Sequence, residues 1–585
     1  MERKWWVHYV LNGLVDQKNL SIKATDLRML QTPPKLVEKY KDAGWWGESI
    51  VTDCLDRWVN EIPDHVAIVS HFYLNDRTEE LTYRQVHSLV DRFAAGLLEM
   101  GVNSKDRVLV QLPNWWHFSI IYLACIKIGA TIVPVTPIMR HREVRHILHR
   151  TQARLAIIPA EFRSNNYIEM MSDLVKELSN PPMIVVVGDS VPEPMISFES
   201  VLLDQSRNLG SNVQKLTDYR PNAISQISCI CFTSGTTGEP KGVMHNQATM
   251  MFQTRGPANV LGLGTADTVL MPSPLGHYTG FQYGINTPIT LGMKTVLMDY
   301  WNPTVAIRLI ESEQVTWTWA STTFLMDLAE SDDLTSHNTE SLRYFICGGA
   351  SIPSALVNDI HHRTSCRIIP DWGMTECGGV TFVDPKDSIS KSALTDGTPM
   401  PEMEMKIVDQ NTKTAVSAGK EGILFVRGPS QFVGYYQRPD LWEKSHHQEW
   451  FDTGDLARMD EEGYIRIVGR TKDIIIRGGE NIPVADVEEV LFGHPKIKEA
   501  SVVAVPDQRL GERACACVIL KGSDNFSLEE LQSWFDSNKM AKQYWPENVE
   551  IFDDFPKTPA GKVQKYILRE TVQARLQNDI GDNVL

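Results

Sequence analysis

The chain alternates between segments with apolar residues at helical spacing and short apolar runs typical of strands. Residues 81–102 carry apolar side chains at helical spacing, and the pattern ends at Gly101. The sequence predicts a strand at 106–112, a helix at 117–130 and a second strand at 131–135. Alternation of this kind indicates βαβ units and a parallel sheet.

The same alternation resumes over about 218–398 and then changes character. Residues 405–436 predict shorter strands joined by turn residues, as in a small barrel. After Arg470, strands and helices alternate again in a pattern that predicts a separate α+β domain. The expected fold class is therefore α/β. A large N-terminal region of βα-wound sheets with a small distorted β-barrel is followed by a small, mobile α+β C-terminal domain.

The first 50 residues mix charges with aromatic side chains and lack a long apolar core, so we expect no secretory signal. They are interpreted as an N-terminal arm. Four tryptophans in this arm are candidates for packing onto the body of the protein: Trp5, Trp6, Trp45 and Trp46.

The most apolar segment, residues 118–135, is the best candidate for a membrane span. Lys127 interrupts it and Pro134 breaks its end, which leaves far fewer than the ~20 apolar residues that a span needs. We therefore expect a buried helix followed by a buried strand, and no transmembrane segment.

Charge and cysteine content narrow the function classes. The chain has 57 Lys and Arg against 73 Asp and Glu, a net charge of −16, which argues against non-specific nucleic-acid binding.

Nine cysteines among 585 residues do not form a disulfide framework. Cys229/Cys231 and Cys515/Cys517 lie in apolar runs, and we expect buried thiols that point to opposite faces of their strands. A reducing, cytoplasmic compartment fits this pattern.

The segment "TSGTTGEPKG", residues 233–242, follows an apolar, β-rich run and combines glycines, hydroxyl side chains and a lysine. Glycines such as Gly235 and Gly238 let backbone N–H groups approach an anion, and the hydroxyls add further donors. The glycine and lysine spacing differs from the P-loop of phosphotransferases. The segment predicts a phosphate-binding loop, with a simple flexible turn as the alternative.

Five further motifs follow in order: "SPLGHYTG" at 273–280, "CGGAS" at 347–351, "DWGMTECGG" at 371–379, a long segment at 450–482, and "PKTPAGKVQK" at 556–565. Together with the glycine-rich loop they resemble the motifs of the adenylate-forming superfamily, in its acyl-CoA synthetase branch. The resemblance covers about residues 50–575. It implies an N-terminal arm at 1–50, a large adenylation domain at 51–471, and a small domain at 472–585 that carries the catalytic lysine.

The resemblance assigns the nucleotide site. Thr233, Ser234, Thr236, Thr237 and Lys241 should hold the β- and γ-phosphates of ATP. Trp372 should stack on adenine, Thr375 should contact the α-phosphate, and Glu376 should ligate Mg²⁺ together with Thr236. Asp455 should accept hydrogen bonds from the ribose, and Arg470 should fix ribose or phosphate. The remaining nucleotide-side positions are Gly349, Ala350, Asp371, Gly373 and Met374.

Lys562 is the expected catalytic cation, bridging the acyl carboxylate and the α-phosphate. It belongs to the small domain, so that domain must close for adenylation. In this family the domain then rotates and presents a thiol tunnel. Gly478 and Gly479 would leave room for the pantetheine arm of CoA, beside Glu480. Lys472 matches the hinge position, with an ordinary surface lysine as the alternative.

His277 matches the histidine that often gates the acyl site, with an ordinary buried histidine as the alternative. Tyr278 follows it, where ligases of dihydroxybenzoate tend to have Asn, and the Asp that holds an amino acid's amine is not evident. These features favour a medium-chain, cyclic or aryl carboxylic acid as the small-molecule substrate.

The leading hypothesis is an ATP- and Mg²⁺-dependent acid–CoA ligase. A ligase that loads an acyl carrier protein or an amine would share these motifs, as would a light-emitting relative. A non-catalytic nucleotide-binding paralogue is the alternative of another class, although Lys562 and Glu376 are both present. An oligomer is possible.

Overall fold

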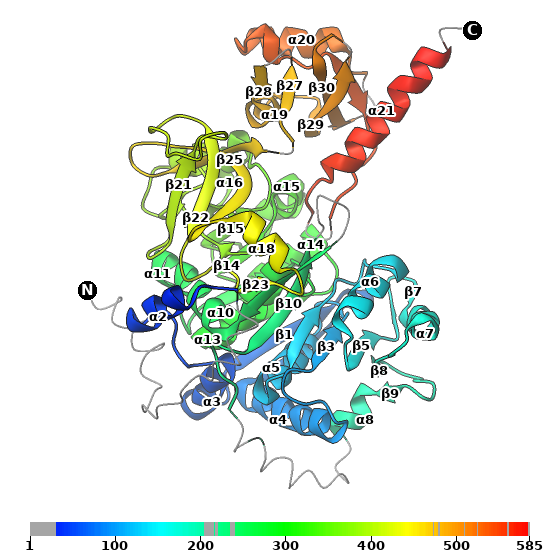
Figure 1. Ribbon diagram of the computed structural model, residues 1–585. Helices are drawn as coiled ribbons and strands as arrows, with labels where there is room; N and C mark the ends of the chain where they lie inside the picture. Colours follow the sequence, from blue (N-terminus) through cyan, green and yellow to red (C-terminus); the bar gives the residue numbers. More distant parts are fainter. Residues whose placement is uncertain are drawn as a thin grey trace.

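The computed structural model (Figure 1) shows two large sheets, a third, smaller sheet and a small C-terminal domain. It describes residues 31–203, 216, 220–233, 240–471, 473–477, 480–507, 509–522, 525–558 and 561–582, with only the backbone for 202–203, 480–481 and 577–582.

The first large sheet has seven strands, and all its pairings are parallel except that of β1 with β2. Parallel strands place their carboxyl ends at one edge of a sheet, where α/β proteins build their sites. The strand order is β16 (Arg367–Asp371), β15 (Tyr344–Gly348), β14 (Trp317–Ala320), β12 (Thr268–Met271), β13 (Lys294–Met298), β1 (Val66–Phe72) and β2 (Arg77–Thr82).

The second large sheet has eight strands, with a parallel body from β10 to β9 and antiparallel partners at the other edge. Its order is β23 (Gly434–Tyr435), β11 (Lys241–Asn246), β10 (Ile227–Thr233), β4 (Thr131–Pro134), β3 (Arg107–Val110), β5 (Leu155–Pro159), β8 (Met183–Val187) and β9 (Ile196–Ser197). The sequence prediction of βα-wound parallel sheets is confirmed.

One apolar core joins both sheets to the helices α3 (Val51–Glu61), α4 (Tyr83–Glu99) and α5 (Trp116–Ile128). Ten of the 13 residues of α5 are buried, which explains why this helix is apolar on all sides. It is followed by the buried strand β4, as expected. Within the described residues, no helix is both long and apolar enough to cross a membrane.

The third sheet begins where the sequence predicted a small barrel and continues beyond it, to residue 470. It has five antiparallel strands: β21 (Glu404–Val408), β22 (Gly422–Arg427), β25 (Trp450–Met459), β24 (His446–His447) and β26 (Ile465–Arg470). The described part of the N-terminal segment packs beside it. Trp46 is buried, and its indole donates a hydrogen bond to the Pro429 carbonyl at 2.8 Å.

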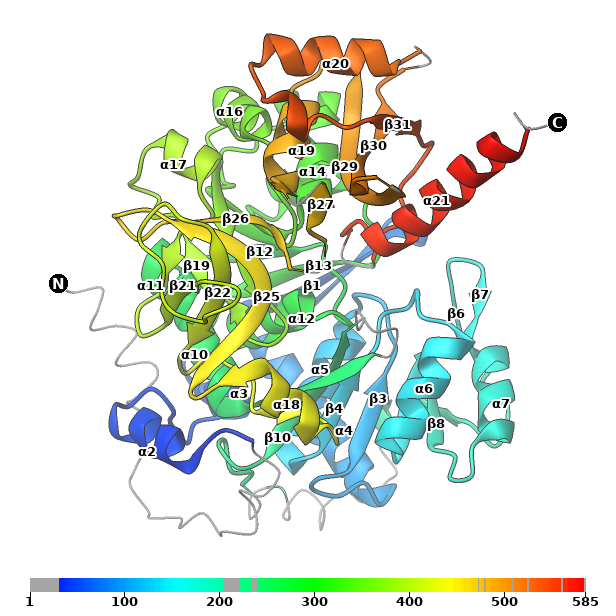
Figure 2. The same ribbon diagram turned by 45° about the horizontal axis from the view of Figure 1, so that its top comes forward.

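The C-terminal domain has a sheet of its own, formed by β27 (Ile475–Arg477), β28 (Glu480–Ile482), β29 (Ile497–Asp507), β30 (Gly511–Leu520) and β31 (Asn548–Ile551). Its helices are α19 (Val484–Phe492), α20 (Leu528–Ser537) and α21 (Lys565–Asp582). Figure 2 shows this domain, in orange and red, above the large domain, with α21 projecting to one side.

All nine cysteines are free and buried, as the sequence predicted. The expected orientation of the paired thiols was wrong. The Sγ atoms of Cys229 and Cys231 lie 4.0 Å apart, and Cys515 and Cys517 belong to one apolar cluster. Side chains alternate along a strand, so residues two apart share a face.

Candidate active site

The sequence motifs converge on a cleft of about 2470 Å³ between the large domain and the C-terminal domain. Typical small-ligand sites occupy about 300–1,000 Å³, so this cleft has room for more than one substrate. Its floor is made by the carboxyl ends of parallel strands, where β10 ends at Thr233, β15 at Gly348 and β16 at Asp371.

The glycine-rich loop is described only at its two ends. Thr233 and Lys241 face each other across the β10–β11 pair. The Lys241 ammonium lies 5.5 Å from the centre of the Tyr435 ring. The sequence candidates Ser234, Gly235, Thr236, Thr237 and Gly238 lie outside the described residues.

Trp372, Asp455 and Arg470 form one hydrogen-bonded group in the cleft. The Trp372 indole Nε1 donates to Asp455 Oδ2 at 2.9 Å, and Arg470 Nε lies 2.8 Å from Asp455 Oδ1. Asp455 and Arg470 are register partners on β25 and β26, which explains why they meet. The Asp455 carboxylate raises the pKa of Arg470, so the guanidinium stays charged.

Glu376 is held by the chain segment that follows the third sheet's strand β22. The Tyr435 hydroxyl donates to Glu376 Oε1 at 2.9 Å, and the Phe432 amide donates to the Glu376 carbonyl at 2.6 Å. Burial raises the pKa of the Glu376 carboxyl. A nearby cation would favour its ionised form, and Lys241 and Arg470 act in that direction.

Thr375, next to Glu376, is anchored by a histidine that the sequence reasoning missed. His245 Nε2 lies 2.7 Å from the Thr375 carbonyl, and its Nδ1 lies 3.1 Å from Thr249 Oγ1. Because a carbonyl only accepts, Nε2 carries the proton. Burial lowers the pKa of His245 to about 4, so the ring is a neutral brace. Its position on β11, a few residues after the phosphate loop, was the available signal.

The hairpin that carries Thr375 and Glu376 is tight. Gly373 and Met374 form β17, which pairs with β18 (Gly378–Gly379). A Cβ atom on Gly373 would lie 2.4 Å from the Gly378 carbonyl oxygen, so only glycine fits. Gly349 and Ala350 follow β15 and line the same cleft, and Gly349 has a φ of +85°.

Asp371 is buried at the end of β16. The residue is 9% exposed, and burial raises the pKa of its carboxyl well above the usual range. Cβ atoms built on Gly348 and Gly379 would fall within 3.0 Å of its two carboxyl oxygens. Asp371 therefore lines the cleft with its carboxyl packed closely against Gly348 and Gly379.

Lys562 enters the cleft from the C-terminal domain. The Gly561 carbonyl beside it accepts a hydrogen bond from Thr323 Oγ1 of the large domain at 3.0 Å. The positive charge of Arg470, followed by burial, lowers the pKa of Lys562 to about 8. Asp455 and Asp473 oppose this shift. The lysine therefore lies in the electrostatic field of the Trp372–Asp455–Arg470 group.

His277 borders the cleft at the start of α12 (Tyr278–Phe281), and its Nδ1 accepts a hydrogen bond from the Thr279 amide at 3.4 Å. Burial, assisted by the charge of Lys562, lowers the pKa of His277 to about 4. The ring is therefore neutral at pH 7.

Aromatic side chains form the wall of the cleft beside His277. The Tyr278 ring stacks on His245 with centroids 4.6 Å apart. Tyr283 and Trp319 stack with centroids 3.6 Å apart and an interplanar angle of 17°. This wall is mostly apolar and suits an apolar acid.

The expected thiol-side residues are described in part. Glu480 begins β28, opposite Arg477 of β27, whereas Lys472, Gly478 and Gly479 lie outside the described residues.

Comparisons with known proteins match this arrangement. The family described as "AMP-binding enzyme" matches residues 55–436, and "AMP-binding enzyme C-terminal domain" matches residues 486–562. The chain belongs to the AMP-binding enzyme family. It is therefore an adenylate-forming enzyme, and the resemblance to this superfamily that the sequence motifs indicated is confirmed.

Two curated relatives of this AMP-binding enzyme cover most of its length. The "Medium-chain fatty-acid--CoA ligase" of Escherichia coli (strain K12) is 35% identical over 93% of this chain and 94% of its own. The mitochondrial "Medium-chain acyl-CoA ligase ACSF2" of Mus musculus is 30% identical over 90% of this chain and 88% of its own.

Solved structures share the fold of this AMP-binding enzyme. The anthranilate CoA ligase AuaEII, in complex with anthranoyl-AMP, matches with a TM-score of 0.80 at 24% identity, over 91% of this chain and 98% of that one. The amide bond synthetase McbA from Marinactinospora thermotolerans matches with a TM-score of 0.77 at 25% identity, over 89% and 99%. The prediction of a mixed α/β fold with a large N-terminal and a smaller C-terminal domain is confirmed.

Proposed function

We propose that this enzyme joins a medium-chain, cyclic or aryl carboxylic acid to CoA in two steps. ATP first converts the acid into an acyl-AMP, and the thiol of CoA then takes the acyl group. The observation that carries the proposal is the position of Lys562, which the C-terminal domain brings into the field of Asp455 and Arg470. The two relatives that match most of this chain, both named as medium-chain CoA or acyl-CoA ligases, support it.

In the first step, a carboxylate oxygen attacks the α-phosphorus of ATP. The new bond joins acyl oxygen to phosphorus, and the bond from the α-phosphorus to the bridging oxygen of pyrophosphate breaks. Both reactants are anions, so positive groups must offset their repulsion. Lys562 would lie between carboxylate and α-phosphate, and Thr375 would donate to the α-phosphate.

Nucleotide binding would use the group around Asp455. Its carboxylate already accepts from Trp372 and lies against Arg470, yet a carboxylate offers about four acceptor positions. Two of these remain for the ribose hydroxyls. Adenine would lie against Trp372, and Lys241 and Thr233 would hold the outer phosphates with the loop between them.

The residues present fit a magnesium ion held mainly by the nucleotide. Mg²⁺ in such sites takes one or two carboxylates, with phosphate oxygens and waters. Glu376 supplies one carboxylate, fixed by Tyr435. In the described part of the chain, no cluster of three or more His, Cys, Asp or Glu could hold a metal ion alone. Bound there, Mg²⁺ would neutralise phosphate charge.

In the second step, the thiol sulfur attacks the acyl carbon, a C–S bond forms, and the bond to AMP breaks while the thiol proton passes to solvent. Lys562 is not needed for this transfer. The C-terminal domain, proposed to span 472–585 with a hinge at Lys472, would turn and bring Gly478, Gly479 and Glu480 to the site. His277 would border the path to the acyl group.

The test is to incubate the protein with ATP, Mg²⁺ and a panel of carboxylic acids, and to measure pyrophosphate release with and without CoA. Mass spectrometry identifies the acyl product. Acid-dependent pyrophosphate together with acyl-CoA is the expected result. Acyl-AMP without acyl-CoA would instead favour a carrier protein or an amine as acceptor, the alternative that the likeness to an amide bond synthetase motivates.

A further inference from the structure

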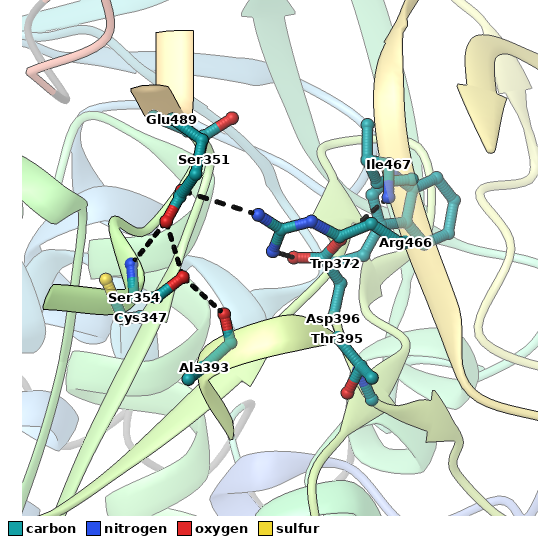
Figure 3. A network of polar contacts seen from close by, with 12 residues as sticks. Cys347, Ser351, Ser354, Trp372, Ala393, Thr395, Asp396, Arg466, Ile467 and Glu489 are labelled. Carbon is teal, nitrogen blue, oxygen red and sulfur yellow. Dashed lines mark hydrogen bonds and ion pairs between the residues drawn. The ribbon is translucent and has the colours of Figure 1, made fainter. Parts of the chain in front are cut away.

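A second contact joins the two domains away from Lys562, between Glu489 of α19 and Ser354 of the large domain (Figure 3). The Ser354 amide donates to Glu489 Oε1 at 2.9 Å, and Ser354 Oγ donates to the same oxygen. Ser354 is the first residue of α16 (Ser354–Arg363). Its amide has no partner within the helix, and the helix dipole favours a carboxylate at this end.

The other carboxylate oxygen of Glu489 faces the third sheet. Glu489 Oε2 lies 3.8 Å from a terminal nitrogen of Arg466 on β26, and the other terminal nitrogen of Arg466 lies 3.7 Å from Asp396 Oδ1. Asp396 Oδ2 accepts from the Ile467 amide at 2.7 Å. The side chains of Arg466 and Asp396 are 16% and 14% exposed, so solvent screens these charges weakly.

The contact at Glu489 is linked to the segment that carries Lys562. The adjacent residue, Glu488, lies 2.6 Å from the Lys565 ammonium, three residues after Lys562. Glu488 also accepts from the Val502 amide at 2.7 Å. The packing of α19 therefore positions the segment that carries Lys562. It also contacts β26, the strand on which Arg470 lies four residues after Arg466.

We propose that Glu489, Ser354 and Arg466 form a latch that holds the C-terminal domain in the arrangement competent for adenylation. The latch must open before the domain can turn for thiol transfer, an inference that rests on the proposed function. Glu489 is a positioning residue, because it touches no reacting atom and acts through the placement of Lys562.

The test separates the two half-reactions in the full-length protein. Acid-dependent exchange of labelled pyrophosphate into ATP measures adenylation, and acyl-CoA formation from supplied acyl-AMP measures thiol transfer. The variants are Glu489→Gln, which removes the charge, and Ser354→Ala, which removes one donor. Asp536→Asn is the matched control, because Asp536 is an exposed acid on α20 of the same domain.

Loss of a charge-assisted hydrogen bond should lower the kcat of exchange by about tenfold in Glu489→Gln. The KM for ATP should stay within about twofold, since the nucleotide contacts belong to the large domain. In Glu489→Gln, the rate of thiol transfer from supplied acyl-AMP should be unchanged or higher. Ser354→Ala should change both rates in the same direction as Glu489→Gln. Asp536→Asn should match wild type.

Exchange at the wild-type rate in both latch variants would overturn the latch, and so would an equal loss in both half-reactions. Wild-type protein that shows no exchange with any acid would overturn the proposed function, and the latch with it.

Discussion

The indole N–H of Trp372 donates a hydrogen bond to Asp455 at 2.9 Å, across 83 residues of sequence. Arg470 holds the other carboxylate oxygen at 2.8 Å. The two contacts fix the carboxylate that we propose for ribose binding before any nucleotide arrives. Such preorganisation reduces the cost of ordering side chains on binding.

Trp372→Phe should raise the KM for ATP by about tenfold, because it keeps an aromatic face but removes a hydrogen bond to a charged acceptor. Trp301→Phe is the matched control. Trp301 Nε1 also donates to a carboxylate, Asp327, at 2.7 Å, but that pair lies outside the cleft. Initial rates at varied ATP concentration give the KM for ATP of both variants. Equal KM values in Trp372→Phe and Trp301→Phe would contradict this role of Trp372.

Adenylation should fall as pH rises above about 8, because the pKa of Lys562 is lowered from 10.5 to about 8 and the ammonium is the active form. The falling limb should appear in kcat/KM for ATP, which reports the free enzyme. Bound phosphates raise the pKa of Lys562, so kcat should decline at higher pH.

The positive charge of Arg470 is the main cause of this lowered pKa, so Arg470→Gln should move the falling limb of kcat/KM to higher pH. A limb at the same pH in wild type and Arg470→Gln would show that another group controls it.

Tyr435→Phe should increase the Mg²⁺ concentration needed for half-maximal activity by several-fold. The substitution removes the hydroxyl that orients the Glu376 carboxylate, a contact of about 1.5–3 kcal/mol when the acceptor is charged. Tyr464→Phe removes a comparable contact, to Asp387 at 2.6 Å, outside the cleft. Magnesium titrations that do not distinguish the two variants would argue against this function of Tyr435.

Trp319→Leu should shift the preferred acid toward longer or bulkier chains, because Trp319 and Tyr283 form a stacked wall in the cleft. One methylene changes binding by about 1–3 kcal/mol, so a series of acids that differ by single carbons should resolve the shift in kcat/KM. An unchanged order of preference would place the acyl group elsewhere in the cleft.

The sequence predicted the parts of the site that lie in glycine- and motif-rich segments. Lys562 and Asp455 stand in such segments, and both line the cleft. The wrong prediction about Cys229 and Cys231 came from a mistaken strand period, since residues two apart share a face.

Other site residues are set by tertiary contacts, which a single sequence does not display. Tyr435 reaches Glu376 across 59 residues, and His245 reaches Thr375 across 130. Glu489 and Ser354 are separated by 135 residues, and neither stands in a motif that predicts contact between domains. Their partners depend on how the third sheet and the C-terminal domain dock onto the large domain.

The proposed reaction passes through an acyl-AMP, and labelling the carboxylate oxygen shows this most directly. The enzyme is given a carboxylic acid labelled with ¹⁸O in its carboxyl group, ATP and CoA, and the products are weighed by mass spectrometry. Attack of the carboxylate on the α-phosphorus predicts one ¹⁸O in the AMP and none in the pyrophosphate. Unlabelled AMP, or label in phosphate released with ADP, would rule out an acyl-AMP intermediate.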